Sequence, residues 1–501
     1  MGVKLVHMMG KAEDLASETF YLTVMQASQY VVAFIFYMVV ARVLSPSEVG
    51  SFSLLLMVLA VFNTLTLVAL NNAVIKYVSE NMGAGDGECA ASVSHKALKL
   101  ILGVSLPALA VGFASSPMLS AYTGTGVLEV SSILISAFVL NLTSYYGAVM
   151  YGLSMFRQVS AQNVLYTFSS RFAGVFLAFV GLKVLGLSLG FLAGSAMTLL
   201  YSIAVLKGRM RRSKRHFPSA KLLRFSLPVY GANVIGLMQS WLDVAVLSGI
   251  AGLGAAGTYY IAVSSVAPLS ILWAPLSSAL FPTLSWINGS GRRGEIAELH
   301  RRSIRIATAI ILPLSVALAS VSHTALSIVY GGKYAEASLP FTILALSAIL
   351  TAYTSVLSAE LQSVGKTKPI FLAGLASTAA YALMLSATAS WLGQVGAALS
   401  RALMVAVGFF TLYREADVRG FGNLGRSIAV AVAIAAALTP MELFLETAIY
   451  LKALAEAVTL LIVAFACFKV IKPLETEEIK LVKSIVPWKL KPLNSSVQAS
   501  R

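Results

Sequence analysis

Charged residues are scarce in this sequence. Asp, Glu, Lys and Arg together make up 12% of the 501 residues, whereas soluble proteins carry roughly 25%. This scarcity excludes the water-exposed surface that a soluble protein of this length would need. Hydrophobic residues make up 58% instead, and they gather in long runs. Because a helix needs about 20 apolar residues to cross a bilayer, the sequence predicts an all-α integral membrane protein.

Several chemical motifs are also missing. Only two cysteines occur, Cys89 and Cys467, and they form neither a disulfide framework nor a CxxC zinc pattern. The sequence contains no phosphate-binding P-loop, no paired metal ligands at helical spacing and no nucleophile motif. We therefore expect no enzyme activity, no cofactor and no metal site. Any energy for transport would then come from an ion gradient or from consumption of the product.

The apolar runs predict about fourteen transmembrane helices. They lie near residues 19–40, 49–70, 100–119, 130–150, 158–182, 184–206, 225–250, 255–284, 306–330, 338–360, 369–391, 395–413, 427–445 and 449–468. The proline-rich region around 255–287 leaves room for one span more or fewer.

The loops between these runs sort the basic residues sharply. With the N-terminus in the cytoplasm, nearly all loop Lys and Arg residues are cytoplasmic, and only Arg42, Lys183, Lys333 and Lys452 lie outside. This is the distribution that the positive-inside rule describes. It predicts a multi-pass protein of the cell (plasma) membrane with both termini in the cytoplasm. The net charge of +16 thus serves to orient helices and contact anionic lipid, and nucleic acid is not an expected partner.

An internal repeat divides the chain. Val43-Leu44-Ser45 and Gly50 recur as Val246-Leu247-Ser248 and Gly257, and two further short matches show nearly the same offset of about 207 positions. The offset carries six helices, so both copies enter the membrane from the same side. We therefore expect two pseudo-symmetric six-helix lobes plus two extra helices. The predicted domains are 1–215, which ends in a basic linker, 216–424, 425–472 for helices 13 and 14, and a cytoplasmic tail at 473–501.

Three arginines lie in or next to predicted spans, where charge is costly and usually faces a cavity or a partner. Arg171 is the deepest, roughly 20 Å along its helix from Gln158. It either attracts an anionic headgroup such as phosphate or donates to the carbonyls of neighbouring helices. Arg401 and Arg42 lie nearer the outer ends of their helices, where snorkelling to headgroups is the alternative to a role in a substrate cavity.

Two acidic residues are candidates for gating or ion coupling. Asp243 lies at nearly the same depth as Arg42 in the repeat-related helix, so we expect the two to pair as part of an outer gate. Glu360 lies at the inner end of helix ten, where it either lines a cavity or stays at the membrane interface.

Several short segments resemble one transporter family. They are Val40-Ala-Arg-Val-Leu-Ser-Pro-Ser-Glu-Val-Gly50, Asn72–Glu80, Leu227-Pro-Val-Tyr230, Tyr330-Gly-Gly-Lys-Tyr334 and Gly393-Gln-Val-Gly-Ala-Ala-Leu399. These segments are spread over essentially the whole chain. They are similar to segments of polysaccharide-unit (Wzx-like) flippases of the multidrug/oligosaccharidyl-lipid/polysaccharide exporter superfamily. The resemblance implies two six-helix lobes around a cation-lined cavity. It also implies alternating-access transfer of a polyprenyl-(di)phosphate-linked oligosaccharide from the cytoplasmic to the outer leaflet for polysaccharide or glycan biosynthesis. Arg42, Arg171 and Arg401 are residues of the same type as the basic residues that line such cavities.

Other functions remain open alternatives. A peptidoglycan-precursor flippase shares the same scaffold. A cation-coupled multidrug exporter would favour acidic residues in its cavity, whereas the deep charge here is arginine. A membrane-embedded glycan polymerase or ligase would be expected to have large charged outer loops, and the outer loops here are short. The expected partners are the lipid-linked oligosaccharide, membrane lipid, and glycosyltransferases or a polymerase of the same pathway.

Overall fold

The protein is described by a computed structural model over residues 25, 26, 28–208, 217–290, 293–416, 424–445 and 447–471. Every regular element in these ranges is a helix. The first is described over Ser28–Val43, and the next seven α-helices complete the N-terminal half. They are α2 (Pro46–Leu67), α3 (Leu70–Gly83), α4 (Gly87–Ala114), α5 (Ser116–Thr123), α6 (Val127–Gly152), α7 (Phe156–Leu177) and α8 (Lys183–Leu206), with a π-helical segment η1 (Ala178–Leu182) before α8.

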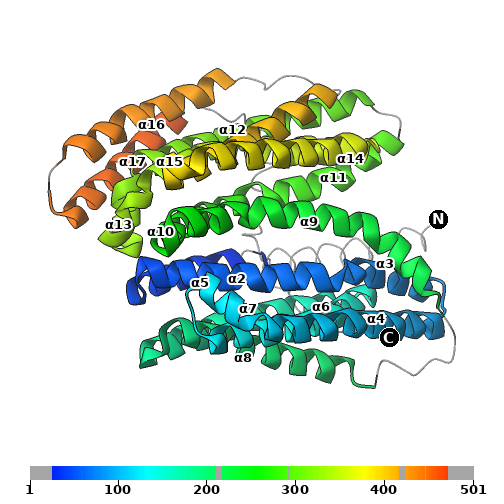
Figure 1. Ribbon diagram of the computed structural model, residues 1–501. Coiled ribbons are helices and arrows are strands. Elements are labelled where there is room, and N and C mark those ends of the chain that lie inside the picture. The colour runs from blue at the N-terminus through cyan, green and yellow to red at the C-terminus, as the bar shows by residue number, and fades with distance from the viewer. Residues whose placement is uncertain are drawn as a thin grey trace, which may run out of the picture.

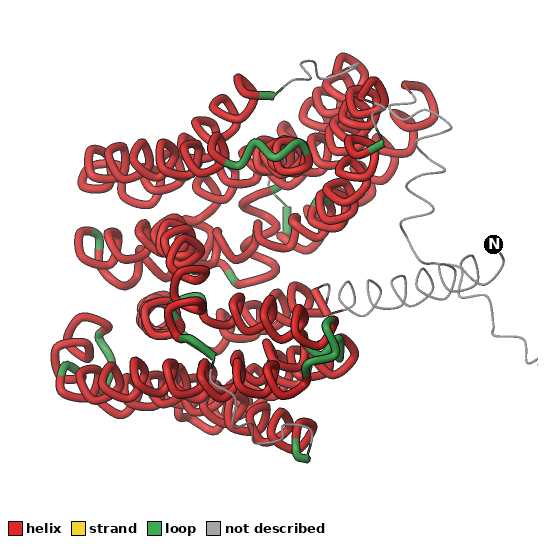
Figure 2. Tube along the Cα trace, turned by 90° about the vertical axis from the view of Figure 1, so that its right-hand side faces the viewer, coloured by secondary structure: helices red, strands yellow, loops and turns green. Residues whose placement is uncertain are grey.

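The remaining helices follow in the C-terminal half. They are α9 (Ser219–Ile250), α10 (Gly252–Val266), α11 (Ala274–Gly289), α12 (Arg293–Ser320), α13 (Ser322–Tyr330), α14 (Ser338–Ser363), α15 (Lys368–Glu415), α16 (Leu424–Phe444) and α17 (Ile449–Ile471), with 3₁₀ segments η2 (Ala267–Leu272) and η3 (Gly332–Ala337). Figure 1 shows α2 to α8 as a lower group of roughly parallel helices and α9 to α17 as an upper group. The tube in Figure 2 shows the same stacked helices from the side.

Among the described residues, eleven helical stretches are long and apolar enough to cross a membrane. Two of them are too long for one crossing: Phe156–Leu206 has 51 residues and α15 has 48, which would extend over about 75 Å if straight. Each contains a glycine with positive φ, Gly181 at 102° and Gly393 at 52°, where the chain reverses. The chain is therefore a multi-pass membrane protein, and the exact number of fourteen spans stays a prediction.

The proline-rich region around 255–287 forms one interrupted helix. The 3₁₀ segment η2 begins at Ala267 and contains Pro268, and it separates α10 from α11. Proline has no N–H for the helical ladder and clashes with the preceding turn. The interruption follows from that chemistry, and it divides the long predicted run at its first proline.

The start of α2 shows how local sequence fixes a helix end. The hydroxyl of Ser45 accepts from the backbone N–H of Glu48 at 3.3 Å, while a Glu48 carboxylate oxygen accepts from the N–H of Ser45 at 2.8 Å. This is a capping box, with Pro46 at the first helical position. The other Glu48 oxygen lies 2.8 Å from Lys183 Nζ, so the same side chain also ties α2 to the start of α8.

The two groups of helices touch most closely where α2 meets α10. A Cβ atom at Gly50 would lie 1.9 Å from the carbonyl oxygen of Leu253, and one at Gly257 would lie 2.0 Å from that of Pro46. These are the two glycines that the internal repeat aligns. Their lack of a side chain lets the backbones of the two halves touch.

Further contacts join the groups at this end of the molecule. Lys333 Nζ donates to the carbonyl of Leu44 at 2.6 Å, and the hydroxyl of Tyr122 donates to the carbonyl of Ala245 at 3.2 Å. We call this end, where the chain also reverses at Gly181, the closed face. We call the opposite end, where α8 ends at Leu206 and Lys207 follows, the basic face.

Outside these contacts, α9 bridges the groups and the last two helices lie at the periphery. Ser226 on α9 donates to the carbonyl of Ala69 at 3.3 Å, whereas α16 and α17 pack on each other and on α12 and α13. The predicted domain boundaries at 215 and 472 fall outside the described residues and the one at 424 falls at the start of α16, so the four predicted domains stay predictions. The predicted tail 473–501 also lies outside the described residues.

Candidate functional site

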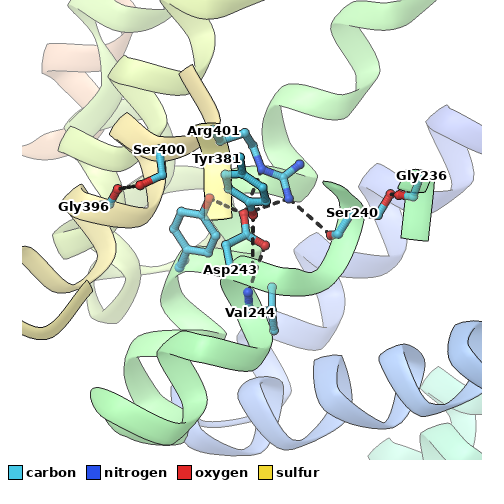
Figure 3. Close-up of polar contacts among 9 residues, drawn as sticks. Gly236, Ser240, Asp243, Val244, Tyr381, Gly396, Ser400 and Arg401 are labelled. Atoms are coloured by element: carbon cyan, nitrogen blue, oxygen red, sulfur yellow. Dashed lines mark hydrogen bonds and ion pairs between the residues drawn. The ribbon is translucent and has the colours of Figure 1, made fainter. Parts of the chain in front are cut away.

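A buried ion pair joins Asp243 on α9 to Arg401 on α15, in the part of α15 that follows the reversal at Gly393 (Figure 3). Asp243 is fully buried, and its Oδ2 lies 2.7 Å from Arg401 Nη2 and accepts from Arg401 Nε at 2.8 Å. The hydroxyl of Tyr259 donates to the same oxygen at 2.6 Å, and the N–H of Val244 donates to Oδ1 at 2.9 Å. Both carboxylate oxygens therefore have partners, as a buried charge requires.

Arg401 also reaches beyond Asp243. Its side chain is 18% exposed, and Nη2 donates to the carbonyl of Ser240 at 3.2 Å. Figure 3 shows Arg401 between Asp243 and Ser240 on one side of α9. Since Ser240 lines the cavity described below, the guanidinium contacts one lining residue of that cavity while it neutralises the buried carboxylate.

The predicted pair between Arg42 and Asp243 is wrong for this conformation. Arg42 is exposed and donates to the carbonyls of Ile328 and Val329 at the end of α13. Equal depth in the membrane suggested the pairing, but Asp243 faces α15 and is occupied by Arg401. Arg42 still joins the two groups of helices at the closed face, through backbone carbonyls instead of a carboxylate.

A cavity of about 470 Å³ lies between α2 and α9. Its polar lining consists of amides, hydroxyls and one indole, and no lining residue carries a charge. The lining residues are Ala60, Asn63, Thr64, Leu67, Ala69, Asn71, Ala232, Asn233, Gly236, Leu237, Ser240 and Trp241. Asn63 lies thirteen positions beyond Gly50 on α2, roughly 20 Å farther from the closed face. We call this space the central cavity.

A smaller pocket of about 200 Å³ enters the N-terminal group of helices. Asn71 lines both spaces, and the pocket's other polar residues include Thr143, Gln162, Asn163 and Tyr166. Gln162 is fixed there, because its Nε2 donates to the carbonyl of Thr143 at 2.9 Å and to the hydroxyl of Ser202 at 2.8 Å. Uncharged amides and aromatic rings suit sugar hydroxyls and sugar faces better than they suit ions.

Arg171 lies on α7 close to an aromatic cluster. Its guanidinium carbon is 5.9 Å from the ring centre of Phe36, and its Nη1 makes a long contact of 3.4 Å with the carbonyl of Thr167. Its Nε is buried without a hydrogen-bond partner among the described residues. Arg171 does not line the central cavity, but the Phe36 ring beside it has its centre 5.1 Å from the ring centre of Tyr37.

An aromatic row connects Arg171 to the central cavity. The hydroxyls of Tyr37 and Tyr260 are 2.8 Å apart, and the Tyr260 ring stacks on Trp241 with ring centres 5.8 Å apart. Trp241 in turn lines the cavity. The sequence analysis missed Asn63, Asn71 and Asn233; amides within apolar helices were the available signal.

Glu360 is buried in the C-terminal group, away from the central cavity. Its Oε2 lies 2.5 Å from Nδ1 of His300, and both side chains are almost fully buried. The pair sits between α12 and α14 near the basic face. The predicted roles of Glu360 and Asp243 in gating or ion coupling, and of Arg42, Arg171 and Arg401 in substrate binding, stay predictions.

The sequence matches the family described as polysaccharide biosynthesis protein over residues 15–288. Two named relatives are more specific. The Haloferax volcanii protein named "Probable low-salt glycan biosynthesis flippase Agl15" is 24% identical over 369 residues, which cover 73% of this chain and 76% of the relative. The succinoglycan biosynthesis transport protein ExoT of Rhizobium meliloti is 25% identical over 341 residues, or 66% of each chain.

Solved structures share the fold. The lipid II flippase MurJ in an inward closed conformation superposes with a TM-score of 0.72 at 14% identity, over 89% of this chain and 98% of that one. An inward-facing multidrug resistance transporter of the MATE family, from the MOP superfamily, gives 0.62 at 15% identity, over 78% and 94%. The predicted fold class is therefore confirmed.

Proposed function

The chain belongs to the polysaccharide biosynthesis protein family, and on that premise we propose that it is a flippase. Its substrate is a polyprenyl-(di)phosphate-linked oligosaccharide, which it moves from the cytoplasmic to the outer leaflet for polysaccharide or glycan biosynthesis. The observation that carries the proposal is the uncharged, amide-lined central cavity, one of whose lining residues, Ser240, is hydrogen-bonded to Arg401. Two named relatives, a glycan biosynthesis flippase and a succinoglycan transport protein, support the same substrate class.

The two faces of the bundle give the transport its direction. The positive-inside rule supports an orientation with the basic face and both termini in the cytoplasm and the closed face at the outside of the plasma membrane. The Gly50–Gly257 contact then seals the outer side, while the central cavity lies farther toward the cytoplasm. A conformation of this kind receives its substrate from the inner leaflet.

Different parts of the site would bind different parts of an amphiphilic substrate. Arg401 and Arg171 supply positive charge for the phosphate, the aromatic row and the asparagines contact the sugars, and the lipid tail stays in the bilayer. Arg401 would exchange its bond to the Ser240 carbonyl for a phosphate oxygen while Nε keeps its bond to Asp243. No catalysis is required of any of these residues.

In the proposed alternating-access mechanism, the two lobes move relative to each other. Residues 1–215 and 216–424 act as two lobes that rock about the central cavity, and the last two helices, α16 and α17, lie beside them. Outward opening has to break the contact between α2 and α10 and the bonds of Arg42 and Lys333. Asp243 keeps Arg401 in position throughout, and Glu360 stabilises the cytoplasmic end of the second lobe. Glycosyltransferases would supply the substrate, and a polymerase would consume it.

The multidrug exporter is the second candidate, because a transporter of that class shares the fold. A cationic drug needs an accessible acidic group, but the carboxylate next to the central cavity, Asp243, is fully buried and bound to Arg401. The structure therefore favours an anionic substrate. A peptidoglycan-precursor flippase would use the same phosphate chemistry and differs only in the sugar.

Translocation of a fluorescent lipid-linked oligosaccharide in proteoliposomes tests the proposal. We expect the wild type to move it to the opposite leaflet, the Arg171→Ala variant to lose most of this activity, and Arg171→Lys to keep part of it. The control, Lys469→Ala, lies at the end of α17 away from the cavity and should match the wild type. No translocation of any polyprenyl-linked glycan by the wild type, together with export of a cationic dye, would establish the exporter instead.

A further inference from the structure

A second group of charged side chains lies far from the central cavity, where the α16–α17 hairpin meets α13. Glu442 on α16 accepts from the N–H of Thr324 at 3.0 Å and from its hydroxyl at 2.6 Å. Lys452 on α17 places its Nζ 2.9 Å from Oε2 of Glu442 and donates to the Glu442 carbonyl at 2.6 Å. The charges of the Glu442 carboxylate and the Lys452 ammonium group therefore neutralise each other.

Glu456 adds a second carboxyl group that this arrangement does not satisfy. It is one turn after Lys452 on α17 and only 3% exposed. Its Oε1 is buried and has no hydrogen-bond partner among the described residues. Residues four positions apart share one face of a helix, so the Glu456 carboxyl lies on the side of α17 from which Lys452 reaches Glu442, next to the Glu442 carboxyl.

The chemistry of carboxyl groups determines what a contact between Glu442 and Glu456 requires. Two ionised carboxylates can only accept hydrogen bonds, so a direct contact between them requires a proton on one of them. With both ionised, the two carboxylates and the single ammonium of Lys452 would leave a net negative charge on side chains that are at most 12% exposed, which is costly. One proton removes that charge and supplies the missing donor.

Among the described residues, α12 and α13 bring no other group that could do this. α13 contributes His323, which is exposed, and α12 has no titratable side chain over residues 306–320. No group of three or more His, Cys, Asp or Glu side chains suited to a metal ion occurs among the described residues. The site is thus suited to a proton more than to a metal cation.

We propose that Glu442 and Glu456 form a proton-binding site that holds the α16–α17 hairpin against α13. The shared proton bridges the two carboxyl groups, and Lys452 and Thr324 orient Glu442. Loss of the proton would leave two buried carboxylates in contact, which repel each other and weaken the docking of the hairpin. This inference does not depend on the proposed transport function.

Infrared spectroscopy of the purified full-length protein tests for the proton. We expect the wild type to show the stretch of a protonated carboxyl group at neutral pH and to lose it in alkaline buffer. The Glu456→Gln and Glu442→Gln variants should each lose this band, because the glutamine amide donates to the remaining carboxylate. The exposed Glu336→Gln variant is the matched control and should keep it.

Three results would overturn the proposal. The band could be unchanged in both glutamine variants, it could persist in Glu442→Gln so that the proton is not shared, or sodium could abolish it at constant pH. If one variant does not fold, the band in the other still shows whether the carboxyl group replaced in that variant helps to hold the proton.

A cross-link reports on docking of the hairpin. The hydroxyls of Thr439 on α16 and Ser320 on α12 are 3.3 Å apart, so cysteines at both positions, in a chain with Cys89 and Cys467 replaced by serine, should form a disulfide. As the pH rises, we expect the cross-link yield to fall relative to the same pair carrying Glu456→Gln. Identical pH curves for the two chains would show that the carboxyl pair does not control docking.

Discussion

Helix α2 meets the C-terminal half of the protein in two very different ways. Near its start it touches α10 so closely that neither Gly50 nor Gly257 has room for a Cβ atom. About 20 Å farther along, the same helix faces α9 across the central cavity, which Asn63 and Asn233 line. One helix thus carries a close backbone contact at Gly50 and a polar wall at Asn63 and Thr64.

The comparison shows how the two functions of a transporter can be separated along one helix. The contact with α10 determines which face is shut, while the wall facing α9 determines what fits inside. The ion pair of Asp243 and Arg401 supports the cavity from the side of α9. Variants can therefore disturb the support, the seal and the lining separately.

The largest effect is expected from removing the support. Arg401→Ala leaves Asp243 as a buried, unpaired charge, which should lower the free energy of unfolding by about 3–5 kcal/mol. Thermal unfolding in detergent measures this loss. The double variant Asp243→Asn/Arg401→Ala should recover part of it, because no unpaired charge then remains. A single variant as stable as the wild type would show that Arg401 serves only the substrate.

The next effect concerns the seal. Gly257→Leu places a side chain where Pro46 and Gly50 leave no room, and overpacking of this kind costs about 1–3 kcal/mol. The closed contact should open by roughly ten- to a hundredfold, and translocation should fall with it. Labelling of a cysteine at Leu253 by a maleimide that cannot cross the membrane would report the opening. Gly249→Leu, with open space around it, is the control; equal labelling in both variants would contradict the seal.

A smaller effect should follow from changing the lining. Asn63→Leu removes an amide that can bond to the substrate, worth about 1 kcal/mol, so the apparent affinity for the lipid-linked glycan should fall roughly fivefold with little change in stability. Concentration dependence of translocation measures this. Leu65→Ala on the exposed side of α2 should leave the affinity unchanged. If the two variants behave alike, the glycan does not contact this wall.

The smallest effect is expected in the aromatic row. Tyr260→Phe removes the bond between the Tyr37 and Tyr260 hydroxyls but keeps the stacking on Trp241. The protein should lose about 0.5–1.5 kcal/mol of stability and retain most of its translocation. A comparison with Tyr450→Phe, whose side chain is exposed, separates the hydroxyl bond from general sensitivity. A complete loss of translocation would give Tyr260 a direct role with the substrate.

The sequence was sufficient for the membrane class, the approximate helices and the reversals near residues 183 and 393, because hydrophobic run length is a local property. Ser45-Pro46-Ser47-Glu48 even specifies the capping box at the start of α2. The internal repeat aligned Gly50 with Gly257, although nothing in the alignment said that the two glycines touch.

The pairing of charges could not be predicted in the same way. Depth along a helix follows from residue spacing, and it placed Arg42 and Asp243 at one level. The direction in which a side chain points around the helix axis depends on how α9 packs against α15. In the folded protein Asp243 points toward α15 and pairs with Arg401, which lies 158 positions later in the sequence. The lining of the central cavity has the same origin, since Asn63 and Asn233 come together only through packing of the two halves.

The contact between Gly50 and Gly257 also bears on the origin of the molecule. If the two halves arose by duplication of one half-length gene, a single glycine once occupied both positions. Two copies of that ancestor would have met through the same surface, as in an isologous dimer with a two-fold axis. Fusion into one chain freed the two copies to diverge, so that Asp243 and Arg401 could arise in only one of them. The symmetric contact is thus the part of the protein that would have to remain common to both halves.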